Sequence, residues 1–333
     1  MPGRGPAEIK MKPIVCVTNT FPEAGLEVLR PHCELRANRS GKRPTPEDLM
    51  EMVSASAGII TYLSDKIDAN IIDRGRHLQV IANYAAGYNN IDSAYAGQKG
   101  VWVSNTPGVL HETTADLAWA LILASARHIV PADRFTRGGK FDGWAAKLFL
   151  GRDVHGKTLG IVGCGEIGRA VARRAAGFDM KVLYYQRTRL PADEEAALRA
   201  VYAPFADLIE NADFITLHLP LNRDSEHLIG RRELAAMKKT AFLINTARGK
   251  VVDDGALVEA LRTGEIAGAA LDVYENEPAL TEGMTDLDNL LLLPHIGSAS
   301  VETRDRMAVL AAENVLDALA GKKPRSAVNA VER

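Results

Sequence analysis

Short apolar runs alternate with amphipathic stretches along the first hundred residues. The runs PIVCVTN, AGIIT, LQVIANY and VWVSN have the length and the β-branched content of buried strands. Between them, apolar residues recur at helical spacing in 24–30, 46–53, 69–74 and 93–98. Such alternation predicts parallel strands joined by crossover helices, which is a doubly wound α/β domain.

A second alternating series begins at Lys157. Its predicted strands are TLGIVG, KVLYY, FITLHL, AFLIN, IAGAALDV and LLLLPH, and its predicted helices cover 166–176, 205–210, 231–237 and 254–263. Between the two series, residues 112–128 have the pattern of a long helix that joins two domains. A last helix is predicted over 301–320, and the tail SAVNAVER is expected to return to the first domain, which would then be discontinuous.

Composition narrows the class of protein. A chain of 333 residues is long enough for two domains, and 47% apolar with 25% charged residues is ordinary for a globular protein. A net charge of −2 without long runs of one sign argues against nucleic acid and membrane surfaces as partners. Three cysteines at unrelated spacings indicate reduced thiols and no metal cluster, and no apolar run suits a signal peptide. A cytoplasmic protein is therefore expected.

Three glycines mark the start of the second series. Gly163, Gly165 and Gly168 form G-x-G-x-x-G directly after a predicted strand and before a predicted helix. The first glycine permits a tight turn, the second lets the backbone approach a pyrophosphate, and the third allows close helix packing. The helix would offer its first N–H groups, at Glu166 and Ile167, to the phosphates. The segment predicts a Rossmann domain that binds a dinucleotide.

The end of the strand KVLYY bears on the choice between NAD(H) and NADP(H). An NAD site usually places a carboxylate there, to bind the ribose 2′-hydroxyl. This chain has Gln186, Arg187, Thr188 and Arg189 instead, and guanidinium and hydroxyl groups suit a 2′-phosphate. We therefore predict NADP(H) as the preferred cofactor, with NAD(H) possible if both arginines are merely solvated.

Three residues farther along suit the chemistry of a 2-keto acid. Arg248, Glu277 and His295 each follow an apolar run: AFLIN, IAGAALDV and LLLL. In an open α/β sheet, sites form at the carboxyl ends of the strands, so these side chains can converge although they are distant in sequence. Each residue alone could be an ordinary strand-end residue, and the shared placement carries the prediction.

Their roles follow from their chemistry. The planar guanidinium of Arg248 can bind a substrate carboxylate through two hydrogen bonds. His295 can protonate the keto oxygen as a reduced nicotinamide transfers hydride to the carbonyl carbon. A Glu277 carboxylate beside the ring would favour the imidazolium and fix its orientation. The sequence thus predicts a reductase of small 2-keto acids.

At this point the chain resembles the D-isomer-specific 2-hydroxyacid dehydrogenase family over nearly its whole length. The matching segments are ANYAAGYNNID, NTPGVLHETTADLAWAL, GKTLGIVGCGEIGRAVARR, FLINTARGKVVDDGAL, GAALDVYENEP and LLPHIGSAS. The resemblance implies a discontinuous, flavodoxin-like substrate domain (1–106 and 299–333) and a Rossmann dinucleotide-binding domain (107–298). It also implies the catalytic set Arg248, Glu277 and His295.

The resemblance assigns further residues. It implies that Asp272 meets the nicotinamide carboxamide, and that backbone N–H groups near Ala86 and Gly87 hold the substrate carboxylate with Arg248. Four further residues would line the cofactor: Pro220, Thr246, Ala247 and Gly297. Members are typically homodimers built through residues 107–150, and in some members a tryptophan placed like Trp144 reaches the partner's active site.

Within the family, YYQRTR and the stretch from RFTRGG to GIVG look most like glyoxylate and hydroxypyruvate reductases. Phosphite dehydrogenases share pieces of this sequence, but they need a lysine where this chain has Ala86. A second alternative is a corepressor-like protein that senses NAD(H), and the intact catalytic triplet argues against it. Glyoxylate, followed by hydroxypyruvate, is the expected substrate.

Overall fold

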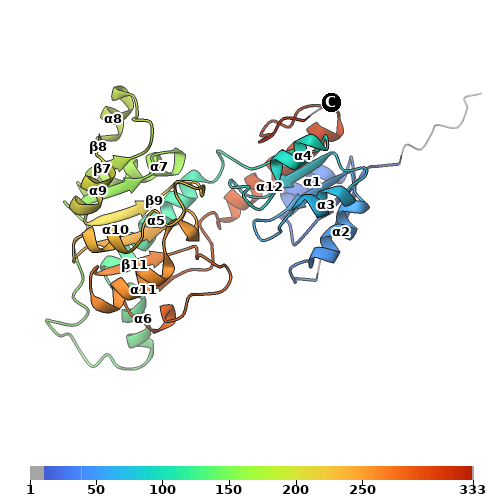
Figure 1. Cartoon of the computed structure of the whole chain (residues 1–333). Coiled ribbons are helices and arrows are strands. Elements are labelled where there is room, and N and C mark those ends of the chain that lie inside the picture. Colours follow the sequence, from blue (N-terminus) through green and yellow to red (C-terminus); the bar gives the residue numbers. More distant parts are fainter. Residues whose placement is uncertain (1–10, 39, 332–333) are drawn as a thin grey trace, which may run out of the picture. The chain divides into compact units, whose positions relative to one another are not determined.

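The computed structural model describes residues 11–38 and 40–331 (Figure 1). The chain forms two compact units, one of residues Met1–Leu110 and Ser300–Arg333 and the other of His111–Ala299. The path therefore changes units at 110/111 and 299/300, whereas the sequence analysis places the division at 106/107 and 298/299. Within the described part of the chain, no helix has the length and apolar character needed to span a membrane.

The first unit is built on a five-stranded parallel sheet with the order β2-β1-β3-β4-β5. This order is that of flavodoxin-like folds, as the fold prediction requires. The strands are β1 (Ile14–Val17), β2 (Glu34–Ala37), β3 (Gly58–Thr61), β4 (Val80–Asn83) and β5 (Trp102–Ser104). The helices are α1 (Glu23–Leu29), α2 (Pro46–Ser54), α3 (Ala69–Arg74), α4 (Ser93–Gln98) and α12 (Val301–Leu319).

The late part of the chain completes this unit. Helix α12 packs on α1 and on β3, β4 and β5. Contact with α1 is close, because a Cβ atom on Gly25 would lie 2.8 Å from the Cβ of Ala308. Beyond the helix, the N–H of Val328 donates to the Val103 carbonyl at 2.8 Å, so the tail lies against β5.

The second unit contains a seven-stranded parallel sheet with the order β12-β11-β10-β9-β6-β7-β8. Counted from β6, this is the Rossmann order 3-2-1-4-5-6 with a seventh strand at the edge, so the predicted fold class is confirmed. The strands are β6 (Thr158–Val162), β7 (Lys181–Tyr185), β8 (Ala200–Tyr202), β9 (Phe214–Leu217), β10 (Phe242–Asn245), β11 (Gly268–Leu271) and β12 (Leu290–Leu292).

Helices cover both faces of this sheet, so every residue of its central strands β9 and β10 is buried. One buried cluster gathers residues of α5 and α7 against the sheet, and the other gathers residues of α9, α10 and α11. The helices are α5 (His111–Ala126), α6 (Ile129–Arg137), α7 (Glu166–Ala175), α8 (Ala192–Leu198), α9 (Phe205–Asn211), α10 (Arg231–Ala236) and α11 (Asp254–Thr263). The sequence pattern did not predict β2, β8, α6 and α8.

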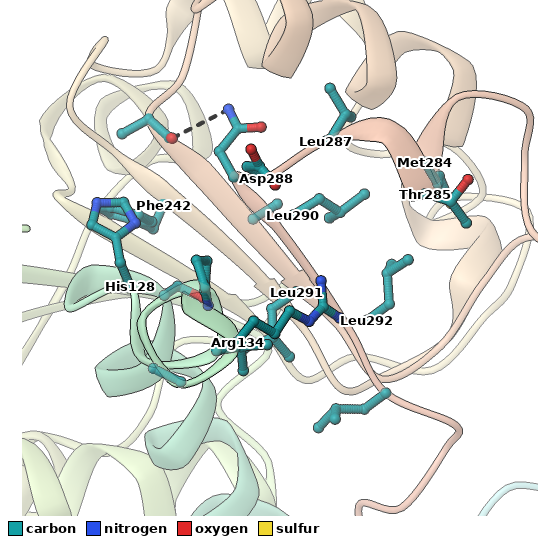
Figure 2. A pocket seen from close by; sticks show the side chains of 18 residues that line it. His128, Arg134, Phe242, Met284, Thr285, Leu287, Asp288, Leu290, Leu291 and Leu292 are labelled. Atoms are coloured by element: carbon teal, nitrogen blue, oxygen red, sulfur yellow. Dashed lines mark hydrogen bonds between the residues drawn. The ribbon is translucent and has the colours of Figure 1, made fainter. Parts of the chain in front are cut away.

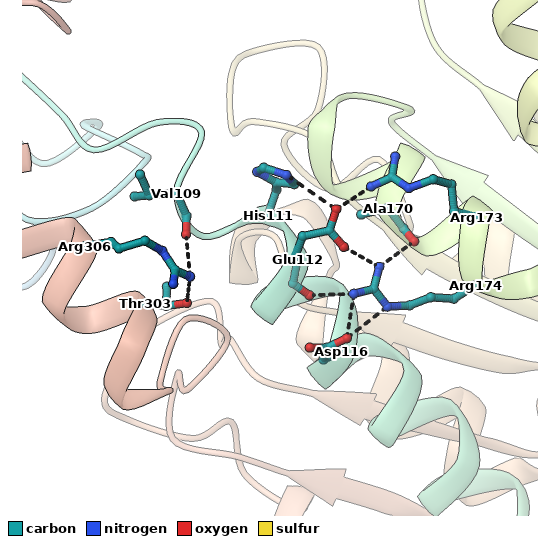
Figure 3. A network of polar contacts seen from close by, with 9 residues as sticks. All are labelled: Val109, His111, Glu112, Asp116, Ala170, Arg173, Arg174, Thr303 and Arg306. Atoms are coloured by element: carbon teal, nitrogen blue, oxygen red, sulfur yellow. Dashed lines mark hydrogen bonds and ion pairs between the residues drawn. The ribbon is translucent and has the colours of Figure 1, made fainter.

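Ion pairs tie α5 to α7 (Figure 3). The guanidinium of Arg174 lies 2.7 Å from a carboxylate oxygen of Glu112 and 2.6 Å from one of Asp116. It also donates to the Ala170 carbonyl at 2.8 Å, and Arg173 pairs with the other oxygen of Glu112. The hydrogen bonds from Arg174 hold the pKa of Glu112 below its ordinary value, against the effect of burial. These ion pairs therefore hold α7, the helix that follows the glycine-rich turn, against α5.

Candidate active site

The glycine turn has the geometry of a phosphate cradle. Gly163 has a φ of +93°, and a Cβ atom there would lie 2.5 Å from the His218 carbonyl oxygen. A Cβ on Gly168 would lie 2.3 Å from the Gly163 carbonyl oxygen, whereas one on Gly165 would meet no heavy atom within 4 Å. Helix α7 begins at Glu166 without a side-chain cap, so its first N–H groups and its positive end face the open side. These features fit a dinucleotide pyrophosphate.

The polar residues after β7 are partly engaged with one another. Arg189 donates two hydrogen bonds, each of 2.8 Å, to the carboxylate of Glu195, and they lower the pKa of Glu195 to about 2. The Gln186 amide donates to the Thr188 carbonyl at 2.6 Å. Arg187 remains 78% exposed and lies 3.5 Å from a carboxylate oxygen of Asp224. Arg187 is therefore the more available of the two cations.

The three predicted catalytic residues follow neighbouring strands of one sheet. Arg248 comes just after β10, Glu277 follows β11, and His295 follows β12, and these strands are paired in the order β10-β11-β12. Their carboxyl ends therefore meet at one edge of the sheet. All three residues belong to the second unit.

Glu277 and His295 form a direct pair. The Nδ1 atom of His295 lies 2.8 Å from Oε2 of Glu277, with 33% and 32% of the two side chains exposed. Burial alone would raise the pKa of Glu277, but the hydrogen bond and charge of His295, the N–H of Tyr274 and the charge of Arg248 together outweigh burial, so the pKa is below its ordinary value. With Nδ1 turned to the carboxylate, Nε2 is the ring atom left to face a substrate.

Arg248 supplies a cation near this pair. Its Nη1 donates to the Ala247 carbonyl at 2.6 Å, which fixes the direction of the guanidinium. Burial lowers the pKa of Arg248, and the Glu277 charge acts in the opposite sense. The guanidinium nevertheless stays charged, because its ordinary pKa is far above neutrality. A half-buried cation of this kind attracts a substrate carboxylate strongly.

Tyr274, which the sequence analysis did not single out, joins the loops that carry the pair. Its N–H donates to Oε1 of Glu277 at 3.1 Å, and its hydroxyl donates to the Leu293 carbonyl, two residues before His295. The backbone at Tyr274 also passes so close to Gly249 that a Cβ there would lie 1.8 Å from it. The glycine after Arg248 thus brings the three loops together.

Asp272 lies at the end of β11 and is buried. Its Oδ1 accepts the N–H of Ile296 and its Oδ2 accepts that of Gly297, both at 2.7 Å. Burial raises the pKa of Asp272, while the two N–H groups oppose this change. Besides the predicted contact with a carboxamide, the carboxylate therefore fixes the turn that follows His295.

The remaining predicted residues are distributed over both units. Thr246 and Ala247 are buried beside β10, whereas Pro220 is exposed. In the first unit, the carbonyl oxygens of Ala86 and Gly87 accept hydrogen bonds from the side-chain amides of Asn105 and Asn83, at 2.6 and 2.7 Å. The peptide groups predicted to bind a carboxylate are thus held from their carbonyl side.

One polar residue at this edge of the sheet was missed. His218 follows β9, so the strand-end rule that selected Arg248 also applies to it. Its Nε2 lies 2.8 Å from the Thr216 hydroxyl and its Nδ1 lies 3.4 Å from the Thr246 hydroxyl. Burial lowers the pKa of His218 to about 3, so the ring is neutral at physiological pH.

Comparisons with known proteins agree with this geometry. Residues 119–297 match the family described as D-isomer specific 2-hydroxyacid dehydrogenase, NAD binding domain. A glyoxylate reductase of Thermococcus gammatolerans is 47% identical over 323 residues, which is 96% of each chain. A solved glyoxylate reductase of Paecilomyes thermophila matches with a TM-score of 0.84 and 33% identity, over 95% of this chain and 98% of that one. An NADPH-dependent glyoxylate/hydroxypyruvate reductase of Sinorhizobium meliloti, solved with NADP and malonate, matches with a TM-score of 0.84 and 30% identity, over 97% of this chain and 99% of that one.

Proposed function

This chain belongs to the D-isomer specific 2-hydroxyacid dehydrogenase family, and from that membership we propose that it reduces glyoxylate, and secondarily hydroxypyruvate, to the 2-hydroxy acid. The pair between Glu277 and His295, beside the Arg248 cation, is the observation that supports this proposal. The glyoxylate reductases among its relatives support the choice of substrate. Neither phosphite oxidation nor corepressor binding is favoured by these relatives.

The reaction follows from the chemistry of the three residues. A bound reduced nicotinamide supplies the hydride for the carbonyl carbon. Arg248 binds the substrate carboxylate, together with the N–H groups near Ala86 and Gly87. The imidazolium of His295 donates the proton on Nε2 to the keto oxygen, while Glu277 accepts the hydrogen bond from Nδ1 and stabilises the ring's charge before transfer. Solvent then returns a proton to the ring.

The test is the replacement of His295 by alanine. Removing a general acid typically costs 10²- to 10⁴-fold in rate, so we expect glyoxylate reduction by H295A to fall by about that factor while the cofactor still binds. Loss of absorbance of the reduced nicotinamide measures turnover, and its fluorescence on the protein measures binding. The control is His227→Ala, since His227 lies 3.1 Å from the Glu275 carboxylate outside the triplet. Full activity of H295A would rule out the proposed role.

The cofactor is a nicotinamide dinucleotide, held by the glycine cradle together with Pro220, Thr246, Ala247, Asp272 and Gly297. We infer a preference for NADP(H). The exposed Arg187 and the Thr188 hydroxyl support this inference, because both suit a 2′-phosphate and no carboxylate stands at the end of β7. Arg189 contributes less, since Glu195 already occupies its guanidinium.

We also propose a homodimer formed by the second unit. A pocket of about 370 Å³ lies between the edge strand β12 and the junction of α5 and α6, and Figure 2 shows its apolar lining of Leu290, Leu291 and Leu292. Helix α6 contributes no buried residue, and an edge strand offers unpaired backbone groups. Leu150, which lines a neighbouring pocket with residues of α6, is 68% exposed, and Trp144 in the same loop is 87% exposed. A second copy of this chain would cover this surface.

Two further assignments complete the proposal. The first unit would be the substrate domain (1–106 and 299–333), and the second would be the dinucleotide-binding domain (107–298). All three cysteines are free and buried, which suits a reducing compartment such as the cytoplasm. Small 2-keto acids are the proposed partners, with no nucleic acid and no membrane surface.

A further inference from the structure

His218 is a partly buried titratable residue that the proposed reaction does not use. Its backbone lies against the glycine turn, because the Gly163 Cβ position is blocked by the His218 carbonyl and the His218 N–H donates to the Val162 carbonyl at 2.8 Å. The residue therefore leaves β9 at the point where β6 enters the phosphate cradle. These two backbone contacts fix the position of His218 next to the cradle.

The ring of His218 connects two hydroxyl groups on neighbouring strands. Thr216, in β9, is fully buried, and Thr246, directly after β10, is nearly so. The ring nitrogens lie 2.8 Å from the first hydroxyl and 3.4 Å from the second. In a neutral imidazole one nitrogen donates and the other accepts, so the ring fixes the direction in which each hydroxyl points.

Thr246 is the member of this chain of contacts that reaches the cofactor site in the proposed function. Without His218 its hydroxyl would rotate freely or turn to another partner, and the site would lose a pre-oriented hydrogen-bonding group. The longer contact to Nδ1 leaves room for the Thr246 hydroxyl to bond a ligand as well. A neutral ring suits this position, because it adds no charge beside the nicotinamide.

From this geometry we propose that His218 is a positioning residue of the dinucleotide site, which holds the Thr246 hydroxyl in the orientation that binds the nicotinamide half of the cofactor. The inference rests on the proposed function, since it needs a dinucleotide in this cradle. His218 acts through Thr246, and its loss weakens cofactor binding more than it weakens proton transfer by His295.

The experiment measures the dissociation constant of NADPH from its fluorescence on the protein, alongside kcat and KM. His218→Phe keeps the ring shape without its nitrogens, and we expect the dissociation constant to rise about tenfold, the value of one hydrogen bond, with a smaller fall in kcat at saturating cofactor. Thr246→Val should give a similar rise. The control is His155→Phe, whose ring is 74% exposed and pairs with Asp179, and it should bind NADPH as the parent does.

The double variant distinguishes a role through Thr246 from general damage. If His218 acts by orienting that hydroxyl, H218F in the T246V background adds little further loss, whereas independent effects multiply. A multiplicative loss, or NADPH binding by H218F as tight as the parent's, overturns the inference. If H218F does not fold, His218→Leu, which also lacks a donor and an acceptor, is measured in its place by the same criteria. A parent protein that binds no dinucleotide would instead refute the proposed function.

Discussion

At the scale of single residues, one loop carries two carboxylates, and each lies next to the imidazole of a histidine from another part of the chain. Glu277 pairs with His295, and Glu275, two positions earlier, lies 3.1 Å from a ring nitrogen of His227. The pairs are chemically alike, and the charge of Arg248 also helps to lower the pKa of Glu277. A variant of Glu275 can therefore serve as the control for a variant of Glu277, the carboxylate that pairs with the general acid His295.

This comparison gives a pH prediction for Glu277→Gln. The lowered pKa of Glu277 means that the carboxylate is charged throughout the neutral range, where it accepts the hydrogen bond from Nδ1 of His295. As the pH falls through that lowered pKa, Glu277 of the parent becomes protonated and comes to resemble the glutamine variant. We therefore expect E277Q to lose about tenfold or more in kcat/KM at pH 7, and the difference from the parent to shrink at acid pH. Glu275→Gln should keep the parent profile, and identical profiles for all three proteins would contradict the pairing.

The two arginines after β7 give a second prediction at this scale. Arg187 is mostly exposed, whereas Arg189 is bound to Glu195. We expect Arg187→Ala to raise the KM for NADPH about tenfold or more, the typical effect of one charged hydrogen bond, and to leave the KM for NADH unchanged. Arg189→Ala should change the ratio of the two KM values less. Equal effects of R187A on both cofactors would rule out contact with a 2′-phosphate.

The candidate site was predictable from sequence where a single rule applied. Arg248, Glu277 and His295 were selected by their positions after apolar strands, and the structure brings two of them into hydrogen-bonding distance. His218 was missed, because the sequence analysis placed it inside the predicted strand FITLHL, whereas β9 ends at Leu217. The two hydrogen bonds that Asp272 accepts from the backbone after His295 could not be predicted from strand positions. They depend on the turn that the chain makes at His295, where φ is +57°.

At the scale of elements, the missed segments share a physical cause. Strand β2 lies at a sheet edge and alternates exposed with half-buried positions, so its sequence ELRA lacks an apolar run. Helix α6 buries none of its residues in the described chain, and α8 is only seven residues long. Strand β8 has three residues and lies at an edge of the seven-stranded sheet. Hydrophobic periodicity arises from side chains that are buried, and these elements bury few side chains within one subunit.

The contact between α5 and α7 carries a stability prediction. Arg174 is 26% exposed and pairs with two carboxylates, Glu112 and Asp116, which are more exposed, so we expect Arg174→Ala to lower the free energy of unfolding by about 1 kcal/mol. Urea unfolding followed by circular dichroism measures this difference. Arg232→Ala removes a guanidinium that is 90% exposed and should change stability by less than about 0.5 kcal/mol.

The same variant has a defined pH dependence. Arg174 lowers the pKa of Glu112 from its ordinary 4.5 in the folded state, so this carboxylate stabilises the fold above that pH. The contribution is lost as the pH falls through the lowered value. The difference between the parent and R174A should therefore be full at pH 7 and shrink below about pH 4. A difference that stays constant down to pH 3 would show that packing, not charge, is what Arg174 provides.

At the scale of the whole molecule, the two edges of the seven-stranded sheet have different surroundings. The β12 edge adjoins a second pocket, of about 450 Å³, that Leu150 helps to line. The β8 edge carries Val201, which is 57% exposed, with no predicted partner. Two grooves that another subunit could fill adjoin the β12 edge, and Val201 lines neither of them.

This contrast gives a prediction for assembly. Leu150→Asp places a charge in the proposed dimer surface, so we expect light scattering to give the mass of a single 36.0 kDa chain, where the parent gives twice that mass. Val201→Asp, at the other edge, should leave the parent's mass unchanged. A parent that already runs as a single chain would exclude the homodimer, and dissociation by both variants would place the contact elsewhere.

The return of α12 to the first unit has a consequence for how a newly made chain matures on the ribosome. Strands β3, β4 and β5 are synthesised early, yet the helix that covers them comes from residues 301–319. The second unit, by contrast, contains all of its strands and helices within residues 111–299. The first unit therefore completes its sheet early but its fold last, and we expect chaperones to shield the apolar sheet face until α12 emerges and covers it.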